Sequence, residues 1–190
     1  PSRGLGDVYK RQNYFPTEIS ALRVFEPRYL LLIADSILNE KNFIVSSSLS
    51  DKYVIGSEVE IVEHQDISNA EQLVIIKCVK LYKINTIDLD REYPYCLAEE
   101  YTEIGLPPTI DELISLEKDI TKAIAKLVEN GMDIELPNYI YDSQNRINKL
   151  NELCIVMPMS INLRNKIIIE NDLYKKYEIL KNYTKDINEN

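Results

Sequence analysis

Hydrophobic and polar positions alternate through most of the first half of the chain, a pattern typical of β-strands, and one early stretch has helical spacing instead. After Pro27, apolar residues recur at that spacing to about residue 40, and Pro27 suits the first turn, where a missing N–H costs nothing. Downstream stretches rich in β-branched and aromatic residues predict strands, and no helix separates them. We therefore expect an antiparallel or mixed curled sheet. The predicted strands cover residues 43–49, 53–63, 73–87 and 95–104, with a polar loop at 66–71.

The pattern becomes helical after residues 105–108, which read Gly-Leu-Pro-Pro. Thr109 and Glu112 have the spacing of a capping box, and an apolar stripe follows until Gly131, a residue that suits a helix end. Three shorter helices are predicted beyond it, and the polar tail is expected to fray. The predicted helix starts are Asp142 or Ser143, then Ser160, then 171–172, and the tail covers 185–190.

The composition is that of a folded, acidic protein. With 190 residues and 45% hydrophobic content, the chain can form a β-rich domain at 13–104 and a helical lobe at 105–190, in an α+β fold. The formal net charge of −9 disfavours nucleic acid and anionic membranes as partners, and no basic cluster offsets it. No apolar run approaches the roughly 18 residues of a membrane span. The three cysteines are scattered without a CxxC pair, so a reducing, cytoplasmic location is predicted.

Residues 1–12 differ in character from the rest of the chain. They hold two of the five glycines and carry a net charge of +2, from Arg3, Lys10 and Arg11 against Asp7. We interpret them as a non-native adaptor or cloning segment and leave them out of the fold prediction. A natural basic arm is the alternative.

Residues able to do chemistry are present without a recognisable catalytic arrangement. His64, the only histidine, is interpreted as a solvated strand residue beside acidic neighbours. None of the five glycines lies in a phosphate-cradling loop, which excludes ATP hydrolysis. One histidine and three scattered cysteines, interpreted as small core residues, do not predict a zinc site. We therefore predict no catalytic residue, no metal and no cofactor.

Tyrosine is unusually common, with 13 residues and no tryptophan. A tyrosine combines an apolar ring with a polar tip, which suits protein interfaces. Half-buried rim positions are an equally good interpretation for each one. The candidates for a protein-binding surface are Tyr93, Tyr101, Tyr139 and Tyr141.

A run of residues near the start resembles the opening of the Lon N-terminal domain, the substrate-recognition domain of ATP-dependent Lon proteases. Phe-Pro at 15–16 is followed at the family's spacing by Leu-Arg-Val-Phe-Glu-Pro-Arg-Tyr at 22–29, and further matches come in order downstream. The resemblance covers about residues 13–184. The motif residues, interpreted as mainly structural, are Phe15, Pro16, Leu22, Phe25, Glu26, Pro27, Arg28, Tyr29, Gly56, Pro94 and Tyr95.

This resemblance implies a PUA-like curled β-sheet or pseudo-barrel with one early helix, followed by a helical bundle. It also implies a non-enzymatic module, of the free-standing bacterial form, that binds unfolded or partner polypeptides. The binding surface would be a groove between the two lobes or an exposed sheet edge that can add a strand. Alternatives are a PUA-like RNA- or nucleotide-binding protein, an N-terminal fragment of a full-length Lon protease, and an enzyme with an unrecognised carboxylate site.

Within the motif, Phe25 and Tyr29 are expected to plug the mouth of the barrel. Glu26 places negative charge at a helix N-terminus, where the dipole favours it. Arg28 can pair with Glu26 or bond strand-end carbonyls, and direct ligand contact by these two residues is the alternative. The chain departs from the family pattern at Thr17, where the family has glycine, and at other positions. The family's first strand would lie just before Phe15 and is predicted to be missing here.

The chain departs from the family pattern at three further residues and at one hairpin turn. Ala21 stands where the family has proline, and Cys78 and Leu81 stand where it has glycine and arginine. A longer polar segment replaces the family's aspartate-glycine hairpin turn.

Overall fold

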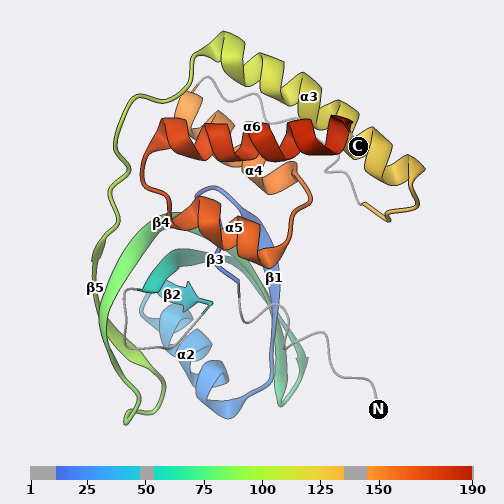
Figure 1. Cartoon of the computed structure of the whole chain (residues 1–190). Coiled ribbons are helices and arrows are strands. Elements are labelled where there is room, and N and C mark those ends of the chain that lie inside the picture. The colour runs from blue at the N-terminus through green and yellow to red at the C-terminus, as the bar shows by residue number, and fades with distance from the viewer. Residues whose placement is uncertain (1–11, 48–53, 135–144, 190) are drawn as a thin grey trace. The chain divides into compact units, whose positions relative to one another are not determined.

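The computed structural model describes residues 12–47, 54–134 and 145–189 and is an α+β protein, as predicted (Figure 1). It divides into two compact units, Pro1–Tyr101 and Thr102–Asn190. Within the described residues, the first unit holds the sheet and one helix, and the second holds four helices. The division falls shortly before the boundary expected at residue 105.

The first unit is built on an antiparallel sheet in the order β1-β4-β3-β2, with β5 also paired to β4. β1 pairs with residues 72–77 of β4 and β5 with residues 82–88, and both lie on the edge of β4 that β3 leaves open. Among the described residues, no pairing joins β2 to β1 or β5, so the sheet is curled and not closed by hydrogen bonds. The strands are β1 (Ile19–Val24), β2 (Phe43–Ser46), β3 (Val54–Ser68), β4 (Glu71–Asp88) and β5 (Tyr95–Glu100).

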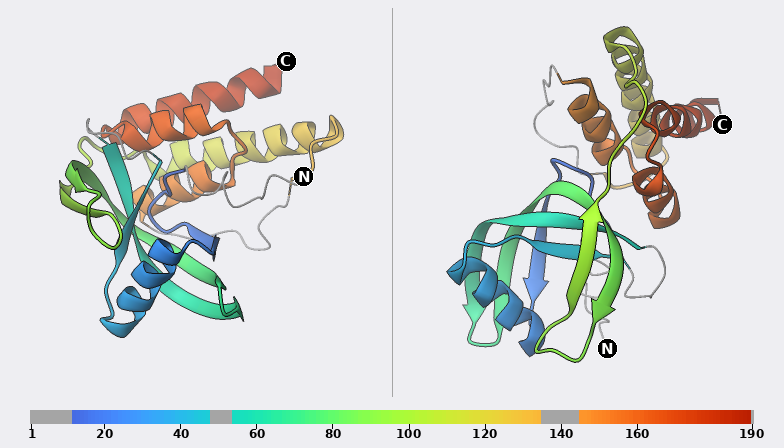
Figure 2. Two further views of the ribbon diagram at one scale, coloured as in Figure 1. Left: turned by 90° about the horizontal axis from the view of Figure 1, so that it is seen from below. Right: turned by 90° about the vertical axis from the view of Figure 1, so that its left-hand side faces the viewer.

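The core of this unit lies where helix α2 (Pro27–Leu38) packs on one face of the curled sheet (Figure 2). Pro27 occupies the first turn as predicted. Ile33 from the helix meets Val59, Val74 and Ile76 from the two long strands, all buried. The residues of β3 and β4 that make this core alternate along each strand, as the sequence pattern requires.

Three strand predictions were wrong. The polar stretch 66–71 is not a loop, because β3 continues to Ser68 and β4 begins at Glu71, leaving only a two-residue turn. Backbone pairing holds this ribbon together although its side chains are exposed. β1 was not predicted at all, since exposed Ile19 and half-buried Leu22 obscure its alternation. The strand predicted at 95–104 is shorter, since β5 ends at Glu100.

The helical unit contains α3 (Ile110–Glu129), α4 (Arg146–Val156), α5 (Ile161–Ile169) and α6 (Leu173–Glu189). The capping box of Thr109 and Glu112 is present as predicted, and Ser160 caps α5. The Asp172 carboxylate accepts from the Tyr174 and Lys175 N–H groups at the start of α6. Asn145 caps α4. The predicted caps, Asp142 and Ser143, lie outside the described residues.

Helices α3 and α6 run in the same direction, which both views show (Figures 1 and 2). The Tyr174 hydroxyl donates to Glu112 Oε1 at 2.7 Å near the two helix starts. Near the other end, Asn188 Nδ2 donates to the Asp119 carbonyl at 3.0 Å and Lys126 Nζ donates to the Asn188 carbonyl at 3.3 Å. These contacts explain why α6 continues to Glu189, against the prediction of a frayed tail.

Candidate functional site

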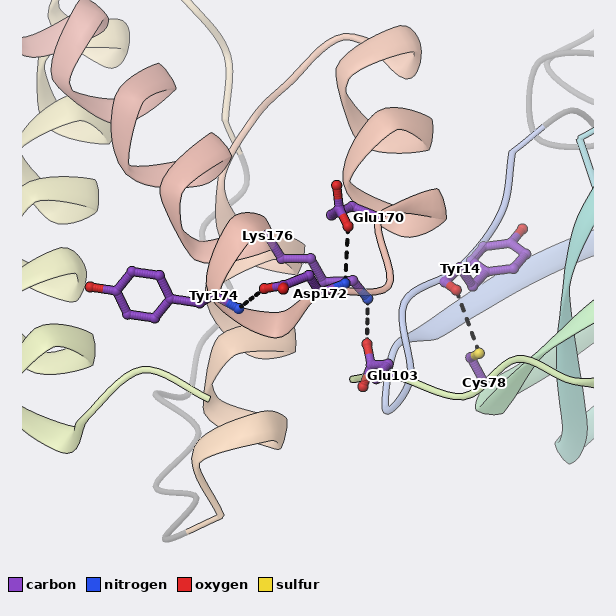
Figure 3. Close-up of polar contacts among 7 residues, drawn as sticks. All are labelled: Tyr14, Cys78, Glu103, Glu170, Asp172, Tyr174 and Lys176. Atoms are coloured by element: carbon purple, nitrogen blue, oxygen red, sulfur yellow. Dashed lines mark hydrogen bonds and ion pairs between the residues drawn. The ribbon is translucent and has the colours of Figure 1, made fainter. Parts of the chain in front are cut away.

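The segment that leads into β1 is anchored in the core of the sheet unit. Tyr14 and Phe15 are both 0% exposed. The Ser57 hydroxyl accepts from the Tyr14 N–H at 2.8 Å and donates to the Tyr14 carbonyl at 2.9 Å, while Cys78 Sγ lies 3.5 Å from the same carbonyl (Figure 3). Phe15 of the motif therefore packs in the core of the sheet unit. Phe25 is not a plug, because 47% of it is exposed.

Both departures from the family pattern in this segment have a structural meaning. Thr17 has φ of 76°, a left-handed conformation that glycine adopts without strain and a β-branched residue does not. Its Oγ1 is buried with no hydrogen-bond partner among the described residues. Ala21 lies on β1, where the Cys78 N–H donates to the Glu18 carbonyl. Because backbone groups alternate along a strand, the N–H of Ala21 points away from β4, so proline would break no sheet bond there.

The charged residues of the motif lie at the start of α2. Glu26 occupies the N-cap position, and its side chain makes no capping hydrogen bond. Its carboxylate is nevertheless placed where the helix dipole favours negative charge. The Arg28 guanidinium lies over the Tyr29 ring, 5.8 Å from its centroid, and Tyr29 packs against the core cluster. Both groups thus support the helix start.

Gly56 allows β2, β3 and β4 to approach closely. A Cβ at this position would lie 2.3 Å from Ile44 Cγ2 and 3.0 Å from Ile84 Cδ1. Gly56 pairs with Ser46 and Tyr82 on its two sides, and a side chain here would displace those of Ile44 and Ile84. The absence of a side chain at this motif residue thus serves the packing of the sheet.

A tyrosine cluster connects the loop before β5 to α2. The Tyr93 hydroxyl donates to Asp35 Oδ2 at 2.9 Å and accepts from the Tyr95 hydroxyl at 3.1 Å. The two rings stack at 4.9 Å, and Arg91 lies 4.6 Å over the outer face of the pair, at Tyr95. The hydrogen bonds with Tyr95 and with Asp35 raise the pKa of the Tyr93 phenol.

The tyrosines predicted to form a protein-binding surface differ in their exposure. Tyr93 is 8% exposed, so its ring belongs to the cluster and offers little area to a partner. Tyr101 is half-buried. Tyr95 is the more exposed member of the stack, and Tyr139 and Tyr141 lie outside the described residues.

A buried ion pair fixes the start of the helical unit. The Lys176 side chain is 1% exposed and pairs with Glu103, and the neighbouring Ile104 forms a parallel bridge with Asp172 (Figure 3). The Ile104 N–H donates to the Asn171 carbonyl at 2.8 Å. A buried ammonium requires such a partner, so residues 103–104 are held against the start of α6.

The cysteines and the histidine have no reactive arrangement. Burial raises the pKa of Cys154 to about 12, and the nearby positive charge of Lys176 lowers it only in part. Cys78 is buried too, whereas Cys96 is exposed and so is not the core residue that we predicted. His64 lies exposed on β3, as expected. Within the described residues, no group of three or more histidine, cysteine or acidic side chains could hold a metal ion, and no helix could cross a bilayer.

A curled antiparallel sheet followed by a helical unit defines a two-unit α+β domain with an uncovered strand, β5, at its edge. The chain belongs to the family of the ATP-dependent protease La (Lon) substrate-binding domain, whose sequence model matches residues 9–185. This family is a non-catalytic domain of Lon. The resemblance inferred from the motif at 15–29 is thereby confirmed.

Two solved structures share the fold. The Lon N-terminal domain protein from Xanthomonas campestris aligns with a TM-score of 0.61 at 18% identity, covering 91% of this chain and 94% of that one. The N-terminal domain of the Lon protease from the Mycobacterium avium complex gives 0.65 at 13% identity, with coverage of 92% and 94%. No curated protein matches the sequence.

Several residues that matter to this geometry escaped the sequence analysis. Lys176 lies between Leu173, Tyr177 and Leu180 on the buried face of α6, and its helical spacing was the available signal. Asp35 and Arg91 gave no such signal, because their partners are distant in sequence or lie across a loop.

Proposed function

We propose that this chain binds segments of other polypeptides and performs no catalysis itself. The observation that carries the proposal is the match of the Lon substrate-binding family over residues 9–185, nearly the whole chain. The contacts of the motif residues support it: Phe15, Gly56 and Pro27 serve packing and helix geometry, which leaves the function to exposed surface.

The electrostatics favour polypeptide over nucleic acid as the ligand. The net charge of −9 repels phosphate backbones, whereas exposed apolar side chains on the sheet unit suit an unfolded chain. Placement in the cytoplasm accords with this role and with three free cysteines.

The test compares folded and unfolded forms of one polypeptide. Fluorescent lysozyme, either native or reduced and capped with neutral carbamidomethyl groups, is titrated with this chain and anisotropy is measured. Both forms have the same sequence and the same positive charge, so the native form controls for simple electrostatic attraction. We expect saturable binding of the unfolded form alone. Equal binding of both forms, or of neither, would overturn the proposal.

A further inference from the structure

β5 is exposed on both faces along almost its whole length, a property that it shares among the described strands with the outer half of β3, residues 62–68. Tyr95 and Leu97 point to one face and are 40% and 72% exposed, and Cys96 on the other face is also exposed. Only Ala98 of its six residues is half-buried. The side chains of a strand added beside β5 would therefore have room on either face of the sheet.

The free edge of β5 can be assigned to particular backbone groups. The Tyr101 N–H donates to the Leu81 carbonyl at 2.9 Å, so odd-numbered residues of β5 direct their N–H and C=O groups toward β4. Cys96, Ala98 and Glu100 therefore direct theirs away from the sheet. No described strand pairs with that side of β5.

The other edges of the sheet are different. The outer part of β3, beyond its pairing with β2 at residues 56–59, is also exposed, but its pairing with β4 is interrupted by register shifts at residues 61–63 and 66–68, and such bulges protect an edge. Along β1, exposed and covered side chains alternate, and every residue of β2 is half-buried. β5 contains no lysine and no proline within its bounds, and its pairing with β4 has a single register shift, at Ile84–Thr86. It is thus the edge best suited to strand addition.

Side chains along β5 divide it into an apolar part and an acidic part. Tyr95 and Leu97 form the first, and Glu99 and Glu100 form the second. Lys83 pairs with Glu99 at 3.1 Å and Lys80 with Glu100 at 3.2 Å, but both glutamate side chains remain more than half exposed and can accept a further cation. The end of β4 and the loop before β5 add acidic charge at residues 88, 90 and 92 against Arg91 alone.

We propose that β5 binds an extended polypeptide segment as an added strand, and that it prefers apolar residues flanked by lysine or arginine. The inference rests on the proposed function and assigns it a site. Main-chain hydrogen bonds to Cys96, Ala98 and Glu100 hold the segment. Apolar side chains lie beside Tyr95 and Leu97, and the flanking cations lie beside the two glutamates.

The probe is a fluorescent seven-residue peptide with a valine-leucine-valine centre and two lysines at each end, so that either strand direction presents the same side chains. We expect it to bind at least about tenfold more tightly than the counterpart with glutamates in place of the lysines. Equal affinity of the two peptides would overturn the charge preference.

N-methylation of the probe tests strand addition directly. Three N-methyl groups on alternate residues leave one hydrogen-bonding edge of the peptide intact, whereas three on consecutive residues interrupt both edges. We expect the alternate form to keep its affinity and the consecutive form to lose about tenfold. Equal binding of the two would overturn the proposal, and the comparison does not depend on any protein variant.

Two alanines on different edges provide matched protein variants. Ala98→Pro removes an outward N–H of β5 without removing a bond to β4, and Ala21→Pro does the same on β1. We expect Ala98→Pro to weaken probe binding about tenfold and Ala21→Pro to leave it unchanged. The bound probe should also slow alkylation of exposed Cys96, while Cys78 and Cys154 stay buried.

The outcomes separate this inference from the general function. Capture of unfolded lysozyme that Ala98→Pro leaves unchanged would keep the function and overturn the site. If the edge pairs with a second copy of the chain, the wild type sediments as a dimer that Ala98→Pro dissociates, and that result also overturns the proposal.

Discussion

β1 and β5 pair with the same edge of β4, but one is built into the core and the other lies open. The segment before β1 is fixed by Tyr14 and Phe15, both fully buried, and β1 shows solvent only one face. Both faces of β5 are exposed to solvent, and the next buried polar contact along the chain is the ion pair of Glu103 with Lys176. A strand that the core does not need to cover is one that can take a partner, which is why the two edges differ in function although their pairing is alike.

The largest expected effect is at the anchor of β1. Phe15→Ala removes a fully buried ring and should lower the free energy of unfolding by about 3 to 5 kcal/mol. Phe25→Ala, in the same motif but with half of its ring in solvent, should cost less than about 1 kcal/mol. Urea unfolding followed by circular dichroism measures both. Similar losses for the two variants would contradict the claim that Phe15 holds the core and Phe25 does not.

The second-largest loss of stability is expected at the ion pair of Lys176 with Glu103, which follows β5 in the chain. Lys176→Ala leaves Glu103 without its buried partner and should cost about 3 kcal/mol, seen as faster hydrogen exchange in α6. The control is Lys83→Ala on the exposed Glu99 pair, which should change stability by no more than about 0.5 kcal/mol. A Lys176 variant as stable as the Lys83 variant would show that residues 103–104 are held by backbone contacts alone.

A gain in stability is expected from a substitution in the segment that leads into β1. Thr17→Gly relieves a left-handed backbone and removes a buried hydroxyl without a partner among the described residues, which outweighs the extra chain entropy of glycine. The expected stabilisation is about 1 kcal/mol, read as a higher melting temperature. Thr17→Ala keeps the strain and should give a smaller gain. A glycine variant that melts lower than the wild type would refute this account of Thr17.

The smallest effect is expected for the family residue at the outer edge of β1. Ala21→Pro removes no sheet hydrogen bond and restricts the unfolded chain, so it should stabilise by about 0.5 kcal/mol. Thermal unfolding of this variant beside Ser20→Pro, whose N–H points toward β4, checks the assignment of the edge. Equal destabilisation by both would mean that the N–H of Ala21 is used.

Local signals carried the sequence predictions that succeeded. The capping box at Thr109 and Glu112, the Ser160 cap and the early helix after Glu26 all depend on neighbours within a few residues, and all are present. The failures involve distant partners. β1 depends on β4, and the end of α6 depends on Asp119 and Lys126 in α3, so neither could be inferred from its own residues.

The sequence by itself determined the family, the α+β class and most helix starts, because a motif of fixed spacing, apolar periodicity and caps are local properties. Only the tertiary structure decided that Thr17 is strained, that Lys176 is buried and that β5 is bare on both faces. Burial, pairing and exposure depend on which distant segments meet. The candidate site is therefore a property of the fold, made from side chains that are unremarkable in the sequence.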